Sequence, residues 1–286
     1  MSTNKELEIY KSNFDLIKKI QIVVYYIDEN RLAWIKKQFY HLNLGIDIFY
    51  FKGYTKEESI DYINDIHPNH PESESDGHLS AMRTLSSVFN WFLKYCKDKE
   101  FLITVEDDCC LLKEEILDSI LKAVNTYKEY YEKFDYVCLG YLPFDINKIK
   151  IRNLPTNSSI YWDMCKNRKS NDDFDEIYGG QMMLFNKDIV MQLSEIFHQK
   201  NTSTIRKMIN ERLLQSYRYS HKVDILLGDH VFPLLFRQSV FYPPLAVEGD
   251  FITENGNQNW TLRPWNKYLD ITDYWINTKQ NQQIIL

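Results

Sequence analysis

A short apolar run that ends in three consecutive carboxylates is the feature that most constrains this chain. Residues 101–105 read Phe-Leu-Ile-Thr-Val without polar alternation, and Glu106, Asp107 and Asp108 follow at once. Such a run is typical of a strand that is covered on both faces, as in the parallel sheet of an α/β protein. Ligands bind to these sheets where the strands end. The junction at residues 106–108 is therefore the candidate active site.

The three carboxylates predict a metal ion and a phosphate-bearing ligand. If extended geometry persists, Glu106 and Asp108 point to one face and Asp107 to the other. Two like charges about 4 Å apart repel by roughly 4 kcal/mol at an effective dielectric constant near 20, so a cation between them is favoured. Carboxylate oxygens suit Mg²⁺ or Mn²⁺, which complete their coordination with water and phosphate oxygens. The alternative is a solvated strand end that caps the helix expected after residue 113.

The remaining pattern alternates strands and helices, which predicts a single α/β domain over residues 1–286. Residues 20–142 would form a nucleotide-binding half, residues 143–250 an acceptor-side half, and residues 251–286 a polar tail. The expected strands cover residues 20–27, 46–51, 101–105, 135–142 and 178–185, with an extended segment at 241–246. The expected helices cover residues 31–43, 79–96, 116–131, 187–198 and 205–217. Polar stretches at 64–77 and 166–177 are expected to be loops that become ordered on substrate binding, or else inert surface.

Composition excludes some classes of function. The chain has 286 residues and a formal net charge of −6, and it contains no block of Lys and Arg. A nucleic-acid-binding surface is basic, so no nucleic-acid partner is expected. The first 20 residues carry charges throughout and no stretch reaches membrane-spanning length, which predicts a cytoplasmic protein without signal peptide or anchor. The five cysteines lack metal or disulfide spacing and are expected to be free thiols.

A second acidic position follows the apolar run at residues 223–227. Asp229 comes after Gly228 and before His230, where it would cap a short helix. An aspartate at such a position accepts backbone N–H bonds and stays ionised beside the positive end of the helix dipole. Asp229 is therefore a candidate functional carboxylate, and helix capping alone is the alternative.

The order of these motifs resembles glycosyltransferase family 25, the lipopolysaccharide and procollagen galactosyltransferase group. The resemblance spans most of residues 20–250. It is carried by the strand that ends at Ile27-Asp28 with Arg31, by Gly77 to Ala81, by Glu106-Asp107-Asp108, by Tyr178 to Lys187, and by Asp224 to Asp229 with Pro243-Pro244-Leu245. Two departures stand out, because Asp28-Glu29 replaces the usual Asn-Leu and the family's Ser-His pair is missing at residues 77–81.

The resemblance implies a GT-A-like nucleotide-binding fold with a mainly parallel central sheet flanked by helices. It further implies an inverting transfer of a hexose from a UDP-sugar, with Mn²⁺ or Mg²⁺, to a hydroxyl group of a glycan or a glycosylated protein. The resemblance implies that Asp229 is the base, with Asp224 and Glu248 as the next candidates. It implies that the metal is bound by Asp108, Glu106 and His230 or His221. It implies that the nucleotide is bound by Asp28, Arg31, Tyr54, Glu106 and Asp107.

Two other functions fit the same residues. A metal-dependent phosphohydrolase would also use clustered carboxylates. A catalytically inactive module that binds a sugar or a partner would keep the fold without turnover. The products released from a nucleotide sugar separate the three.

Overall fold

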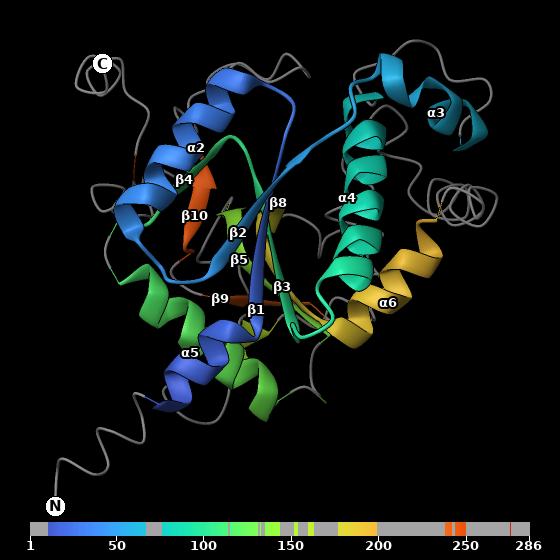
Figure 1. Ribbon diagram of the computed structural model, residues 1–286. Coiled ribbons are helices and arrows are strands. Elements are labelled where there is room, and N and C mark those ends of the chain that lie inside the picture. The colour runs from blue at the N-terminus through green and yellow to red at the C-terminus, as the bar shows by residue number, and fades with distance from the viewer. Residues whose placement is uncertain are drawn as a thin grey trace, which may run out of the picture.

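The described strands of the protein form one continuous sheet in the computed structural model (Figure 1). The structure describes residues 11–66, 76–113, 115–130, 132, 135–143, 152–153, 160–162, 177–198, 238–241, 244–249 and 275. The strand order along the sheet is β2-β1-β3-β8-β5-β9-β7-β6, and β10 pairs with β4 and β5 beside this path. Helices flank the sheet, and most of the described strands point in one direction although antiparallel neighbours also occur, so the expected α/β class with a mainly parallel sheet is confirmed.

Three parallel strands form the first part of the sheet. They are β1 (Ile20–Tyr26), β2 (Asp47–Lys52) and β3 (Phe101–Glu106). β1 lies between the other two and is buried along almost its whole length, because its side chains pack in a hydrophobic cluster on each face of the sheet. The connections are α2 (Glu29–Leu42) between β1 and β2, and η1 (Glu57–Ser59), α3 (Ile60–Ile66) and α4 (Asp76–Tyr95) between β2 and β3. Since all three strands run the same way, their carboxyl ends meet at one edge.

The second part of the sheet is mixed. β8 (Ile177–Asn186) runs antiparallel between β3 and β5 (Tyr136–Pro143). The other elements are β4 (Cys109–Leu111), α5 (Ile116–Glu129), β6 (Arg152–Asn153), β7 (Ile160–Trp162), α6 (Lys187–Ile196), β9 (Gln238–Phe241) and β10 (Ala246–Glu248). The short strand β10 pairs antiparallel with β4, directly after the acidic motif.

Two hydrophobic clusters lie on opposite faces of the sheet. Alternate residues of β1 separate them: Ile22 and Val24 belong to the cluster that α2 and α5 cover, and Val23 and Tyr25 belong to the one that α4 and α6 cover. Figure 1 shows α2 and α5 on one side of the strands and α4 and α6 on the other. The sheet is therefore covered on both faces, and its strand ends are left to bind ligands.

Most element boundaries agree with the sequence expectations, and the main differences are as follows. The helix expected from residue 31 begins two residues earlier, at Glu29, and the strands β6 and β7 were not expected. The expected loop at 64–77 is wrong at its ends, because α3 reaches Ile66 and α4 begins at Asp76. No strand was expected at β4, which separates the acidic motif from α5. The expected helix at 205–217 and the run at 223–227 lie outside the described residues.

Candidate active site

The acidic motif lies at the carboxyl end of β3, beside the carboxyl ends of β1 and β2. The parallel register pairs Tyr25 with Glu106 and Tyr26 with Lys52. β3 ends at Glu106, and residues 107 and 108 form a turn before β4. The alternation expected over residues 106–108 therefore stops at Glu106, and the turn brings Asp107 and Asp108 to the same arginine.

Glu106 is oriented by a tyrosine from the neighbouring strand. The Tyr25 hydroxyl donates a hydrogen bond to Oε1 of Glu106 at 2.8 Å. Burial and the Glu106 carboxylate raise the pKa of Tyr25 well above its usual value, so the hydroxyl stays protonated and remains a donor. The hydrogen bond fixes the carboxylate at the end of the strand.

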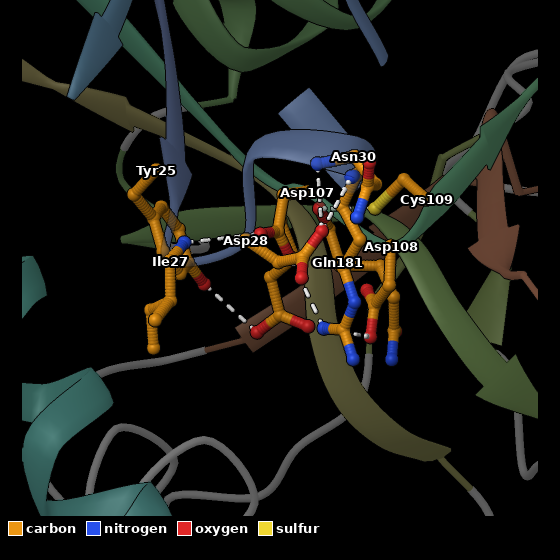
Figure 2. A network of polar contacts seen from close by, with 10 residues as sticks. Tyr25, Ile27, Asp28, Asn30, Asp107, Asp108, Cys109 and Gln181 are labelled. Atoms are coloured by element: carbon orange, nitrogen blue, oxygen red, sulfur yellow. Dashed lines mark hydrogen bonds and ion pairs between the residues drawn. The ribbon is translucent and has the colours of Figure 1, made fainter. Parts of the chain in front are cut away.

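Asp107 points toward the start of α2. Its Oδ2 accepts a hydrogen bond from the backbone N–H of Ile27 at 3.1 Å, and its Oδ1 lies 3.4 Å from a guanidinium nitrogen of Arg31 (Figure 2). Burial raises the pKa of Asp107, and Arg31 opposes that shift. Asp107 therefore ties the acidic turn to the loop after β1.

Asp108 is the least satisfied of the three carboxylates. The residue is 7 % exposed, and its Oδ1 has no hydrogen-bond partner among the described residues. Its Oδ2 lies 4.0 Å from Arg31. Burial, and then the charges of Glu106 and Asp107, raise the pKa of Asp108 to about 8. A buried carboxylate held among like charges favours a cation as its partner.

The turn that carries Asp108 is anchored on both sides by hydrogen bonds to the backbone. Gly249 donates its backbone N–H to the carbonyl of Asp108 at 2.7 Å. Gln38, a fully buried residue of α2, donates to the carbonyl of Cys109 and accepts from the N–H of Leu111, both at 2.8 Å. Sequence reasoning missed Gln38, although its position three residues after the buried Ile35 places it on the apolar face of the helix.

Asp28 caps α2 and thereby positions Arg31. Its Oδ1 accepts from the backbone N–H groups of Asn30 at 2.7 Å and Arg31 at 2.9 Å. A cap of this kind satisfies orphan donors in the first helical turn. Since this carboxylate is engaged by the helix, it would act on a nucleotide through Arg31 and the helix start.

Tyr54 lies after the carboxyl end of β2, at the same edge of the sheet. Its backbone N–H donates to Oγ1 of Thr84 at 3.0 Å, and the guanidinium of Arg83 stacks over its ring at 4.3 Å. Arg83 also donates to the carbonyl of Glu58. These contacts hold an aromatic ring at the position expected for nucleotide binding.

Several predicted site residues lie outside the described part of the chain. They are Asp229, Asp224, His230 and His221, and for Glu248 only the backbone is described, which pairs with Cys109. Within the described residues, no group of three His, Cys, Asp or Glu side chains could hold a metal ion. Asp108 and Glu106 fit a hard divalent cation by donor chemistry and by Oδ1 of Asp108, which has no partner among the described residues.

Comparison with known proteins gives structural similarities alone. No family model matches the chain, and no curated protein matches it. A glycosyltransferase involved in the glycosylation of the major capsid of PBCV-1 matches 70 % of this chain and 75 % of its own, with 10 % identity and a TM-score of 0.35. Mouse xyloside xylosyltransferase 1, in its apo form, matches 65 % of this chain and 61 % of its own, with 9 % identity and a TM-score of 0.34. Similarity at this level concerns the general fold and assigns no activity to this chain.

The four cysteines within the described residues are buried free thiols, as expected: Cys96, Cys109, Cys110 and Cys138. No helix in the described part of the chain has the length and hydrophobicity needed to cross a lipid bilayer.

Proposed function

We propose that this protein is a metal-dependent, inverting glycosyltransferase that moves a hexose from a UDP-sugar to a hydroxyl group of a glycan or a glycosylated protein. The observation that carries the proposal is the buried carboxylate of Asp108, whose Oδ1 has no partner among the described residues although Glu106 and Asp107 lie beside it. The resemblance of Glu106-Asp107-Asp108 to the metal motif of glycosyltransferase family 25 supports the donor class.

Asp108 and Glu106 would hold Mn²⁺ or Mg²⁺, with His230 or His221 as the third protein ligand. When bound, the ion offsets negative charge on the leaving diphosphate. Tyr25 orients Glu106 through its hydroxyl. The acidic strand end would thus bind the diphosphate through the cation, since a direct approach of two anions is unfavourable.

The nucleotide would lie along the carboxyl ends of β1 and β2. Tyr54 offers a ring that Arg83 already holds in place. Arg31 is the cation that contacts Asp107 and Asp108 in the described part of the chain, and Asp28 and Asp107 fix its backbone and its guanidinium. Asp28 and Asp107 would therefore position the nucleotide-binding residues, and Arg31 and Tyr54 would contact the nucleotide.

Asp229 is the proposed base. The acceptor hydroxyl oxygen forms the new bond to the anomeric carbon, the bond to the diphosphate oxygen breaks, and the hydroxyl proton passes to the carboxylate. Asp229→Asn should bind metal and nucleotide almost normally and transfer sugar at least about 100-fold more slowly, because a general base acts in the reaction and not in donor binding. If turnover survives and nucleotide affinity falls, Asp229 is a donor or metal ligand, and Asp224 or Glu248 takes the role of base.

The function is tested by incubating the protein with a panel of nucleotide sugars in Mn²⁺, and separately in chelator, while binding and products are measured. Metal-dependent binding of a UDP-sugar, with release of UDP and transfer of the sugar once an acceptor is added, supports the proposal. Release of inorganic phosphate would indicate the phosphohydrolase, and binding without turnover on any acceptor would indicate the inactive module. Stabilisation by a GDP- or CMP-sugar alone would contradict the donor class.

A further inference from the structure

Gln181 of β8 carries a buried acceptor that no described residue satisfies. The residue is 5 % exposed, and its Oε1 has no hydrogen-bond partner within the described part of the chain. Buried polar atoms in native proteins are almost always paired, and an unpaired one costs stability. An exception of this kind, in the interior of β8 and next to the acidic end of β3, indicates a partner supplied by a ligand.

The strand register places Gln181 beside Glu106. β8 pairs antiparallel with β3, and Val105 lies opposite Met182, so the next pair in this register is Glu106 and Gln181. Cys109 also donates its thiol to the carbonyl of Gln181 at 3.0 Å, which ties β8 to the segment that follows Asp108.

The side chain of Gln181 faces the same side of the sheet as Tyr25 and Glu106. The next residues of the same parity in β8, Met183 and Phe185, pack in the hydrophobic cluster that also contains Tyr25. Because alternate residues of a strand share a face, Gln181 continues the polar row that the Tyr25–Glu106 hydrogen bond begins. Figure 2 shows Gln181 in the same polar cluster as Asp108.

The chemistry of this position selects a neutral hydrogen-bond donor. Oδ1 of Asp108 is a proposed ligand of the cation, which leaves Oε1 of Gln181 as a neutral acceptor without a partner in the described part of the chain. Phosphate oxygens are acceptors too, so a phosphate group cannot satisfy this amide oxygen. A sugar is uncharged and carries several hydroxyl groups, each of which can donate one hydrogen bond.

We infer that Gln181 accepts a hydrogen bond from a hydroxyl group of the sugar in the donor substrate, and that it contributes to the choice of sugar. The inference rests on the proposed function, because it assigns a contact to the sugar of the same nucleotide sugar. A residue kept for a ligand also leaves the free protein with an unsatisfied polar atom. Removal of that atom should therefore not lower the stability of the free protein.

The test compares Gln181→Leu with wild type by calorimetric titration of UDP and of each UDP-sugar in Mn²⁺ without acceptor, together with thermal unfolding of the free protein. Loss of one hydrogen bond to an uncharged hydroxyl should weaken UDP-sugar binding about 3- to 10-fold and leave UDP binding nearly unchanged. The Tm of the free variant should stay the same or rise. Gln181→Glu, which keeps an acceptor but adds charge, should shift the order of preference among the sugars.

Gln21→Leu is the matched control. Gln21 has the same exposure of 5 %, but its amide donates to the carbonyls of Ile22 and Asp47 near the amino end of β1. This variant should lower the Tm and leave the ratio of UDP-sugar to UDP affinity unchanged.

Four results would overturn the inference. Equal loss of UDP and UDP-sugar affinity in Gln181→Leu would assign the residue to the metal or the diphosphate. A lower Tm with an unchanged affinity ratio would make it a structural residue. A wild-type protein that binds UDP-sugars no more tightly than UDP would refute the sugar contact alone. A wild-type protein that binds neither ligand would remove the proposed function and this inference with it.

Discussion

Arg31 and Asp107 form a largely buried ion pair, with a guanidinium nitrogen of Arg31 3.4 Å from Oδ1 of Asp107 and with 15 % and 10 % of the two side chains exposed. The pair joins the first turn of α2 to the turn after β3. Arg31 also lies 4.0 Å from Oδ2 of Asp108, so one cation serves two carboxylates. Arg31 thus offsets part of the charge of the acidic turn.

Removal of Arg31 should destabilise the protein. Arg31→Met leaves the buried carboxylates of Asp107 and Asp108 without this cation, and the free energy of unfolding should fall by about 2–3 kcal/mol. The measurement is chemical denaturation of the metal-free protein. Lys19→Met is the matched control, since Lys19 pairs with Glu100 at 3.2 Å where both side chains are about half exposed, and it should cost less than about 1 kcal/mol. Equal losses in the two variants would contradict the role of Arg31.

Gln38 should affect both stability and the metal site. Gln38→Leu leaves the carbonyl of Cys109 and the N–H of Leu111 without their side-chain partner, and the free energy of unfolding should fall by about 2–4 kcal/mol. Because these bonds hold the segment after Asp108, Mn²⁺-dependent UDP binding should weaken as well. Gln21→Leu should lose a comparable amount of stability and keep its UDP affinity. If Gln38→Leu binds UDP as wild type does, the turn that carries Asp108 does not depend on the hydrogen bonds of Gln38.

Tyr25→Phe tests whether Glu106 needs an orienting hydrogen bond. The substitution removes the hydroxyl that donates to Oε1 of Glu106 and keeps the ring in the core. Loss of a hydrogen bond that orients a metal ligand typically lowers metal affinity about 10- to 100-fold, so Mn²⁺ binding should weaken on that order. The control is Tyr62→Phe, because the Tyr62 hydroxyl is buried and has no partner among the described residues, and its loss should leave both stability and Mn²⁺ binding intact. Unchanged Mn²⁺ affinity in Tyr25→Phe would remove Glu106 from the metal site.

The parts of the fold that were predictable are those whose signal is local. The apolar runs at β1 and β3 end in polar residues, and hydrophobic periodicity marks α4, α5 and α6, so a sequence window of a few turns identifies them. The position of the acidic motif at a strand end follows from the same local pattern. The predicted base Asp229 and metal ligand His230 stay predictions, since both lie outside the described residues.

The parts that were missed depend on partners that are distant in sequence. β4 has three residues and exists because β10 pairs with it, and no local pattern reports that partner. Tyr25 and Glu106 are 81 residues apart, and their hydrogen bond follows only from the register of β1 and β3. Gln38 and Gln181 each left a weak local signal, a polar residue at an apolar position, but its meaning requires the structure that surrounds it.

The substitution Asp108→Asn tests directly whether this carboxylate holds the metal ion on which UDP binding depends, and two measurements are made on it. Burial and neighbouring carboxylates raise the pKa of Asp108 to about 8, so a neutral amide of the same shape should stabilise the metal-free protein and raise its Tm. In calorimetry, wild type should bind UDP only when Mn²⁺ or Mg²⁺ is present, and the variant should lose most of that binding. We expect a variant that is more stable than wild type in the metal-free form and no longer binds UDP. UDP binding that is equal in chelator and in Mn²⁺, or that survives Asp108→Asn, would contradict it.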